Sequence, residues 1–179
     1  VVMDLGCGHG AFLSAARKEG FRHLVGVEVK PSNIAYARTK RNLEILEFSQ
    51  IRNYAGPRVN ALVSMQVLEH LSDPLAVLSA CLPLTAGDAV FIFQVPDMRK
   101  FVYDPGHLTS FSVAGLTALV RRAGLEPRYV LSAKTGRRSL AGCNLYFSPF
   151  CWSLLDSVFV RLNILGGCIT LIATQGGRA

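Results

Sequence analysis

The 179-residue sequence carries a formal net charge of +7; half of its residues are hydrophobic and 17% are charged. This length and composition indicate one globular domain and exclude a disordered protein. The charge would permit a nucleic-acid partner, but the basic residues are scattered, so we expect most of them on solvated surfaces and do not favour nucleic acid. The five cysteines form neither a zinc pattern nor a disulfide framework, which favours a cytoplasmic location.

The first residues predict the end of a buried strand, a glycine turn and the start of a helix. Apolar residues lead to Asp4, and Gly6, Gly8 and Gly10 follow at alternate positions. Glycine has no Cβ and adopts positive φ, so such a turn can bend sharply and let a ligand approach the backbone. A helix is expected over 11–19. Strand, glycine turn and helix together are typical of a nucleotide site at the carboxyl edge of a parallel sheet.

Two acidic residues distinguish between the ligands that this turn could hold. The glycines also fit the relaxed dinucleotide fingerprint, so alone they leave a nicotinamide cofactor open. Asp4, at the end of the first strand, suits a cationic ammonium group better than a pyrophosphate. Glu28 lies near the end of the second strand, expected over 23–29, where an acid can accept hydrogen bonds from both ribose hydroxyls. Together they indicate an adenosine with a cationic amino-acid tail, which is S-adenosylmethionine.

The rest of the sequence alternates apolar runs with helical patterns, as βαβ units do. Helices are expected over 31–46, 74–82 and 113–123, with Asp73 and Ser112 as N-caps of the last two. Further strands are expected in five places: 48–53, 61–65, 90–95, 128–132 and 168–173. The strand over 48–53 has the weakest pattern of these.

Several segments resemble, in chain order, landmarks of class I S-adenosylmethionine-dependent methyltransferases. Residues 4–10 resemble their motif I, and residues 25–28 resemble motif II. Later segments resemble the branch that includes ubiquinone-biosynthesis O-methyltransferases: 64–74, 82–88, 90–96, 107–112 and 123–125. The resemblance implies an α/β fold with a Rossmann-like, doubly wound, seven-stranded and mostly parallel sheet whose last strand is antiparallel. It also implies S-adenosylmethionine as the cofactor, but it does not identify a substrate.

The resemblance also implies which residues bind the cofactor. Asp4 would contact the methionine amino end, directly or through water, and Glu28 would hold the ribose. The glycines would let the cofactor approach the backbone, while Gln66 and Val67 would line the methionyl and methyl region. The implied cofactor-binding residues are Asp4, Gly6, Cys7, Gly8, Gly10, Glu28, Val29, Gln66 and Val67.

Methyl transfer is an in-line displacement at a sulfonium carbon, so a base is needed only when the acceptor must lose a proton. His70 is the candidate catalytic base, because it is expected near the methyl group and imidazole exchanges protons near neutral pH. Alternatively, Glu69 and His70 orient the loop by hydrogen bonds. With His107 they also resemble the metal site of small-RNA 3′-end 2′-O-methyltransferases. Gln66 stands where those enzymes have an acid, so a metal is not expected.

The acceptor is expected to be a small molecule, with a hydroxyl oxygen favoured because the branch that the sequence resembles methylates hydroxyls. Two alternatives stay open: a methyltransferase for RNA or protein, and a non-catalytic methyltransferase-like domain. The second alternative follows from region 48–58, which is short, and from Glu47, the only acid beside it. The family usually carries an acid there, near the adenine amino group. Because the family's leading helix is missing too, residues 1–179 are interpreted as one N-terminally truncated domain.

An unusually apolar segment precedes the last strand. Residues 133–167 are predicted to form a helical insert that covers the sheet edge or provides a homodimer surface. Contact with a membrane surface or with an apolar substrate are the alternatives. Its helical stretches are too short to cross a bilayer, so no transmembrane segment is expected.

Overall fold

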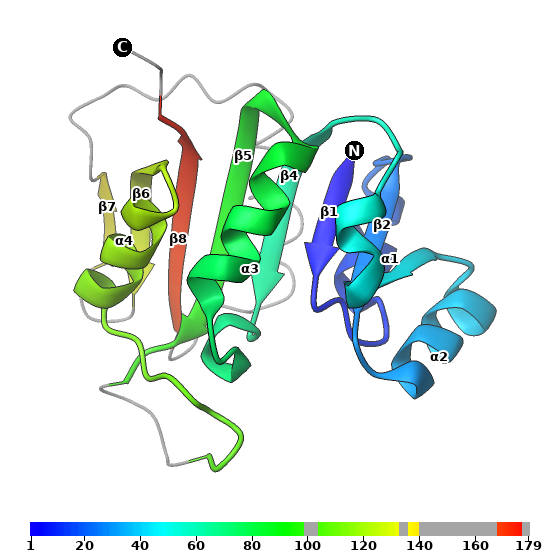
Figure 1. Ribbon diagram of the computed structural model, residues 1–179, viewed down its shortest axis with the longest axis horizontal. Coiled ribbons are helices and arrows are strands. Elements are labelled where there is room, and N and C mark those ends of the chain that lie inside the picture. Colours follow the sequence, from blue (N-terminus) through cyan, green and yellow to red (C-terminus); the bar gives the residue numbers. More distant parts are fainter. Residues whose placement is uncertain (99–103, 133–135, 140–167, 177–179) are drawn as a thin grey trace.

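Figure 1 shows the computed structural model, which describes residues 1–98, 104–132, 136–139 and 168–176. The strands are β1 (Val2–Leu5), β2 (Leu24–Glu28), β3 (Glu44–Glu47), β4 (Val59–Met65), β5 (Thr85–Pro96), β6 (Leu125–Ser132), β7 (Gly136–Ser139) and β8 (Cys168–Gln175). The α-helices are α1 (Ala11–Lys18), α2 (Pro31–Arg41), α3 (Pro74–Cys81) and α4 (Val113–Arg122). Short 3-10 helices are η1 (Phe48–Asn53), η2 (Leu68–His70) and η3 (Leu82–Leu84).

The strands form one sheet in the order β3-β2-β1-β4-β5-β8-β6-β7. Strands β1 to β5 pair in parallel, and β8 is antiparallel to both of its neighbours, β5 and β6. This confirms the predicted Rossmann-like, doubly wound α/β sheet with an antiparallel last strand; the short β7, antiparallel to β6, is added at one edge. Because β1 pairs with β2 on one side and β4 on the other, the winding reverses beside β1, which is where such sheets bind ligands.

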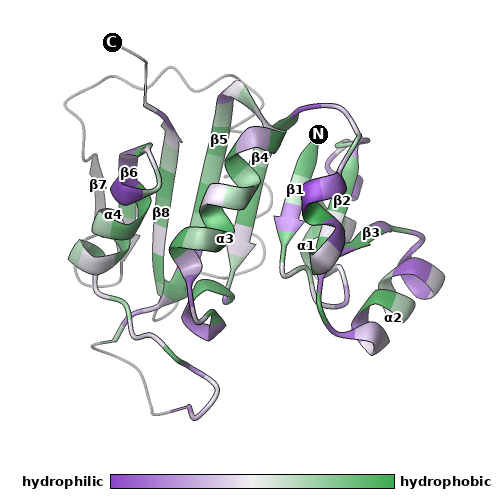
Figure 2. Ribbon diagram, viewed as in Figure 1, coloured by the Kyte–Doolittle hydropathy of each residue, from purple (hydrophilic) through white to green (hydrophobic). Residues whose placement is uncertain are grey.

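Alternation along β1 divides the core into two layers. Successive strand residues point to opposite faces, so Val2 joins the apolar cluster with α1 and α2, whereas Met3 and Leu5 join the cluster with α3 and α4. All of β1 is buried, as expected for a parallel strand covered on both faces. In Figure 1, α3 and α4 lie in front of the sheet, and Figure 2 shows hydrophobic residues along β5 and β8.

Two helices begin where the sequence predicts. The Asp73 carboxylate accepts a hydrogen bond from the Ala76 amide at 2.9 Å, and Pro74 occupies the first turn of α3. The Ser112 hydroxyl accepts one from the Gly115 amide at 3.0 Å at the start of α4. Both side chains thus satisfy an amide that has no partner within its helix.

The predicted position of the third strand was wrong. Helix α2 ends at Arg41 instead of continuing to 46, because Asn42 adopts a left-handed conformation with φ of 50°, a common way to end a helix. The strand that follows is Glu44–Glu47, and residues 48–53 form η1 instead. As a result, Glu47 lies at the carboxyl end of β3, in register with Glu28 of β2. The strand therefore does end on an acid.

The apolar insert predicted over 133–167 was wrong in its first part. Residues 136–139 form β7, which pairs with β6 as a strand and not as a helix. Residues 140–167, and with them most of the predicted dimer surface, lie outside the described residues. Among the described helices, none combines the length and the apolar character that crossing a membrane requires.

Candidate functional site

The turn between β1 and α1 has the backbone conformation that its glycines predict. Gly6, Gly8 and Gly10 have φ of 75°, 53° and 77°, a region that residues with a Cβ rarely adopt. A Cβ at Gly6 would lie 2.2 Å from Cγ2 of Val67, and one at Gly10 would lie 2.3 Å from Cδ1 of Leu43. These two glycines are therefore needed for close packing as well as for conformation, and Gly6 lies directly against the loop after β4.

The Glu28 carboxylate at the end of β2 is held by four hydrogen bonds. One oxygen accepts from the amides of Val29 and Lys30 at 2.7 and 3.0 Å. The other accepts from the Gly8 amide at 2.8 Å and from the Asn33 side chain at 3.4 Å. Burial acts to raise the pKa of Glu28, but these bonds outweigh it and lower that pKa below its usual value. Glu28 is thus an anion bonded to the glycine turn, a contact that sequence reasoning missed.

Asp4 lies at the end of β1 and is almost completely buried, with 2% of its surface exposed. Burial, followed by the negative charge of Glu28, raises the pKa of Asp4 to about 8. A carboxyl group in this setting holds its proton at neutral pH, and a cation placed beside it would favour the ionised form. The site therefore favours the binding of a positively charged ligand group near Asp4.

Cys7 belongs to the same turn but has the character of a packing residue. Burial, then the charges of Asp4 and Glu28, raise the pKa of its thiol to about 12. A Cβ on Gly26 would lie 2.6 Å from the Cys7 sulfur, so the side chain fills the space beside β2. A neutral thiol in this position is a poor nucleophile.

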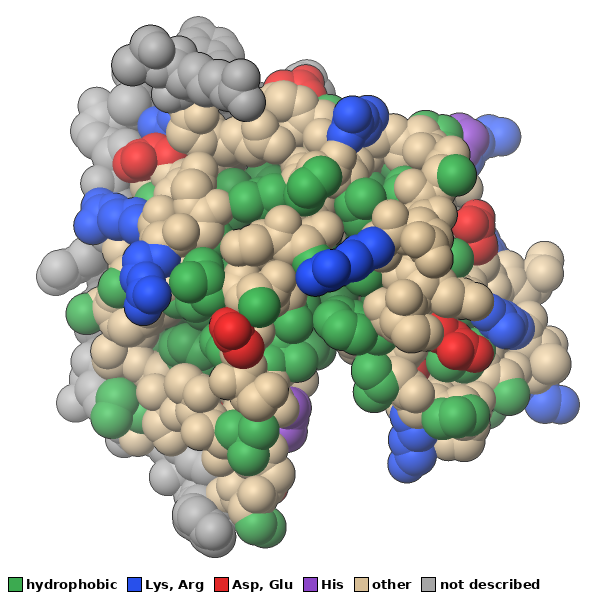
Figure 3. Space-filling model, viewed as in Figure 1, with side chains coloured by type: hydrophobic (Ala, Val, Ile, Leu, Met, Phe, Trp, Pro, Cys, Tyr) green, Lys and Arg blue, Asp and Glu red, His purple; other side chains and the backbone are tan. Residues whose placement is uncertain are grey.

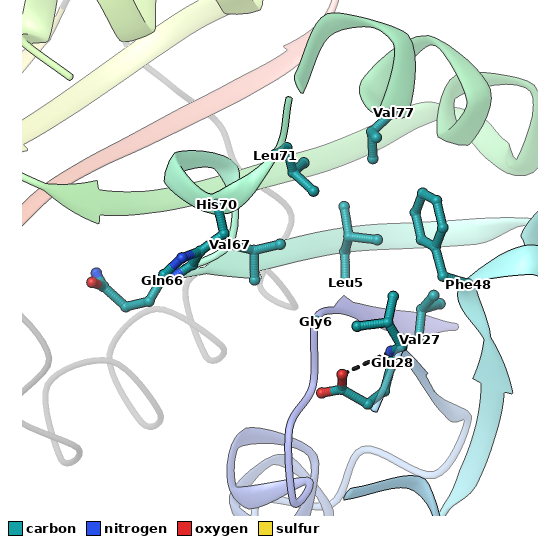
Figure 4. Close-up of a pocket in the computed structure, with 11 residues that line it drawn as sticks. Leu5, Gly6, Val27, Glu28, Phe48, Gln66, Val67, His70, Leu71 and Val77 are labelled. Carbon is teal, nitrogen blue, oxygen red and sulfur yellow. Dashed lines mark hydrogen bonds between the residues drawn. The ribbon is translucent and has the colours of Figure 1, made fainter. Parts of the chain in front are cut away.

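A cavity of about 370 Å³ opens at the carboxyl ends of β1, β2 and β4. Figure 4 shows Gln66 and His70 at one end of it, Phe48 and Val77 at the other, and Glu28 beside Gly6 between them. At the same edge of the molecule, Figure 3 shows a deep notch with a histidine on one wall. The lining residues are Leu5, Gly6, Val27, Glu28, Val29, Phe48, Gln66, Val67, His70, Leu71 and Val77.

This cavity joins predicted residues from three separate segments. Gly6 from motif I, Glu28 and Val29 from motif II, and Gln66 and Val67 from the loop after β4 all line it. The other implied cofactor residues belong to the glycine turn or its buried base and do not line the cavity: Asp4, Cys7, Gly8 and Gly10. Sequence reasoning missed Phe48, because it assigned that residue to the third strand.

Helix η2 and the segment 104–109 are joined beside the cavity. The Nδ1 atom of His70 lies 2.8 Å from the Gly106 carbonyl oxygen; a carbonyl can only accept, so Nδ1 carries the hydrogen and the neutral ring has its lone pair on Nε2. The His107 ring meets that of His70 edge-on, with centroids 4.6 Å apart. The Glu69 carbonyl accepts from the amides of residues 108–109 at 2.8 and 3.1 Å. His70 thus orients the loop with its ring, whereas Glu69 does so with its backbone.

The Glu69 carboxylate takes part in none of these contacts. It is 1% exposed, and neither oxygen has a hydrogen-bond partner among the residues that the structure describes. Burial raises the pKa of Glu69, while its own backbone amide, and then the nearby His70 and His107, act in the opposite direction. Ligand atoms of these three side chains lie within 4.8 Å of one another, an arrangement that could hold a metal ion.

Comparison with known proteins shows which family and which relatives the chain resembles. The model of a family described as "Methyltransferase domain" matches residues 1–130. A probable S-adenosylmethionine-dependent methyltransferase of Mycolicibacterium smegmatis is 27% identical over 135 residues, which cover 70% of this chain and 51% of that protein. A ubiquinone biosynthesis O-methyltransferase of Cereibacter sphaeroides (strain ATCC 17025) is 34% identical over 87 residues, 45% of this chain and 34% of that protein. The chain thus spans about half, or less, of the length of these relatives.

Solved structures show the same fold. An S-adenosylmethionine-dependent methyltransferase from Archaeoglobus fulgidus superposes with a TM-score of 0.64 at 18% identity, covering 97% of this chain and 85% of that one. Because the family model spans more than half of the sequence, the chain belongs to the methyltransferase domain family. The Mycolicibacterium smegmatis relative and the Archaeoglobus fulgidus structure are both described as S-adenosylmethionine-dependent methyltransferases.

Proposed function

We propose that the protein transfers the methyl group of S-adenosylmethionine to a hydroxyl oxygen of a small molecule. The observation that carries this proposal is the single cavity that connects Glu28, at the end of β2, with Gln66 and His70, after β4. Ribose would bind at Glu28, the methionine end would follow the glycine turn past Gly6, and the methyl group would face His70. Each part of the cofactor would then meet a residue of suitable chemistry: a carboxylate at Glu28, open backbone at Gly6 and an imidazole at His70.

The two acids of the site suit the two polar parts of this cofactor. Glu28 is ionised and already accepts hydrogen bonds on both oxygens, so ribose hydroxyls would bind to an oriented carboxylate and share it with the backbone amides. Asp4 lies buried beneath the turn, where an ammonium group would stabilise its ionised form. A pyrophosphate would instead bring negative charge to two carboxyl groups, which disfavours a dinucleotide.

His70 would receive the proton that an acceptor hydroxyl must lose. Its ring lines the cavity, and the Gly106 carbonyl fixes the tautomer that leaves Nε2 able to accept. Alignment of the acceptor oxygen with the methyl carbon and sulfur would supply much of the rate. The relatives named as ubiquinone biosynthesis O-methyltransferases support oxygen as the acceptor atom.

Calorimetric titration of the purified protein with S-adenosylmethionine, S-adenosylhomocysteine and NAD tests the cofactor. We expect both adenosyl ligands to bind, NAD not to bind, and Glu28→Gln to weaken binding at least tenfold by removing the charge that orients the ribose. Asp88→Asn, an exposed change outside the cavity, is the matched control. Binding of NAD alone would overturn the proposal in favour of a nicotinamide-dependent enzyme.

An RNA acceptor is the second candidate, supported by the net charge of +7. Binding that depends on phosphate contacts weakens steeply as salt rises. We expect a labelled oligoribonucleotide to bind only weakly, whereas an affinity that falls strongly between low and physiological salt would favour RNA.

The homodimer predicted for the segment 133–167 stays a prediction, and light scattering of the purified protein would test it.

A further inference from the structure

Helix α3 presents an uncharged, mostly apolar surface to solvent. Residues 74–84, which form α3 and η3, contain no charged side chain, and only Leu78 and Cys81 among them are buried. The other three described α-helices each carry basic residues in their last turn. A surface helix without a charged face is typical of a contact with another molecule.

A groove, here called the α3 groove, runs along α3 on the side of η1. Two adjoining hollows of about 510 and 280 Å³ form it, and Arg52, Ala76 and Ala80 line both. Figure 3, in the view of Figure 1, shows hydrophobic side chains gathered on this face of the molecule. Parallel strands are usually connected by an α-helix, but the connection from β3 to β4 contains only η1. The space beside α3 therefore suits a helix from another molecule.

The side chains of α3 allow such a helix to approach closely. Ala76 and Ser79 are exposed and Ala80 is half-buried, so the wall of the groove consists of short side chains. The distance between packed helices depends on the side chains at their contact. Because α3 carries these small residues itself, it can form the wall of one groove and also fill another.

Charges near the two ends of α3 make this surface complementary to itself. Asp73 directly precedes α3 and is exposed. Arg52, also exposed, lines the part of the groove that Pro83 and Leu84 line after the end of α3. In a two-fold interface the same patch meets itself. Two antiparallel α3 helices would therefore bring Asp73 of one copy toward Arg52 of the other, which favours their association.

We propose that the α3 groove binds α3 of a second copy of this chain in a two-fold homodimer. Each helix then lies in the groove of the other copy. The second copy supplies both the uncharged helix and the acid that Arg52 requires. A membrane surface would instead favour several basic residues around an apolar face, whereas this face carries Asp73 at one end. The proposed interface is separate from the segment 133–167.

The α3 groove shares two walls with the cofactor cavity, because Phe48 and Val77 line both. A helix seated against these side chains would therefore link dimer formation to cofactor binding, a consequence that rests on the proposed function. The affinity for S-adenosylhomocysteine should differ by about fivefold or more between dilute, monomeric and concentrated, dimeric wild-type protein. Equal affinity at both concentrations would overturn this link.

Sedimentation velocity of the purified protein over a concentration series tests the dimer. We expect a reversible equilibrium between monomer and dimer in the wild type. Ala76→Arg, which places a long cation in the groove, and Arg52→Glu, which places an acid opposite Asp73, should each weaken association about tenfold or more. Ala35→Arg, at an exposed alanine of α2 on the opposite face of the sheet, is the matched control and should leave association unchanged.

A wild type that stays monomeric at every concentration overturns the proposal. Equal association of the wild type, Ala76→Arg and Arg52→Glu also overturns it, because the dimer would then form through another surface. The same holds for an equal loss in Ala35→Arg, which added charge alone would explain. Circular dichroism verifies folding, and Arg52→Glu provides the test if Ala76→Arg fails to fold. Absence of S-adenosylhomocysteine binding in every sample would refute the proposed function and leave the sedimentation result intact.

Discussion

Asp4 is the residue at which pH and cofactor affinity should be linked. Its pKa is raised to about 8 in the free protein, so near pH 7 most molecules hold a proton there. An ammonium group lowers that pKa, so binding should release part of one proton, and affinity should rise with pH until the pH reaches about 8. Calorimetry near pH 7 in two buffers of different ionisation enthalpy measures this release. Asp4→Asn should abolish it; undiminished release in that variant would assign the proton to another group.

Gly6 is the residue at which the turn and the loop after β4 touch. Replacing it with alanine imposes a positive φ, which costs about 1–2 kcal/mol, and also forces a clash with Val67, whose Cγ2 would be 2.2 Å away. Gly20→Ala is the matched control, since φ of Gly20 is 94° and an added Cβ would meet no atom of the described residues within 4 Å. Urea unfolding should show a larger loss for Gly6→Ala, and only that variant should lose S-adenosylmethionine binding. Equal losses would show that Val67 moves aside.

At the scale of elements, η1 positions Phe48 at the end of the cavity opposite His70 (Figure 4). A capping box between Glu47 and Gln50 starts this helix, so Phe48 is directed by local hydrogen bonds. Phe48→Ala should weaken binding of S-adenosylhomocysteine about tenfold, the factor that corresponds to about 1.4 kcal/mol. Phe21→Ala, at a half-buried phenylalanine outside the cavity, should not. Unchanged affinity in Phe48→Ala would place the adenosine elsewhere.

The element scale also explains where sequence reasoning succeeded and where it stopped. Helix starts were predictable because Asp73 and Ser112 cap them within three residues along the chain. The end of α2 was not, because Asn42 ends it without the glycine that usually marks such a stop. Consequently β3, only four residues long, was hidden in the predicted helix. Short elements carry too little periodicity to be recognised.

At the scale of the whole molecule, β1 contributes to both apolar layers, so we expect the described domain to unfold in one transition. Met3, which is 0% exposed, lies in one of these layers. Met3→Ala should lower the free energy of unfolding by about 2–5 kcal/mol. Leu108→Ala, at a side chain 64% exposed, should change it by about 0.5 kcal/mol or less. Separate transitions by circular dichroism and by loss of cofactor binding would contradict a single cooperative unit.

The molecule as a whole shows why the glycine turn and the acid at the end of β2 were predictable from the sequence and the contacts of the loop after β4 were not. Asp4, Gly6 and Glu28 belong to compact motifs whose chemistry follows from neighbouring residues. The hydrogen bond between His70 and Gly106 joins positions 36 residues apart, and no local sequence pattern predicts it. The burial of the Glu69 carboxylate depends in the same way on everything packed around it.

The position of β8 bears on how the chain is made. Its residues, 168–175, pair with β5 on one side and β6 on the other, although they follow both in the sequence. A ribosome therefore releases β5 and β6 long before the strand that separates them, and both present open, apolar edges in the interval. Open edges invite pairing with other chains. The nascent protein should thus depend on chaperones until this strand emerges, and messages that stop before it should yield aggregates.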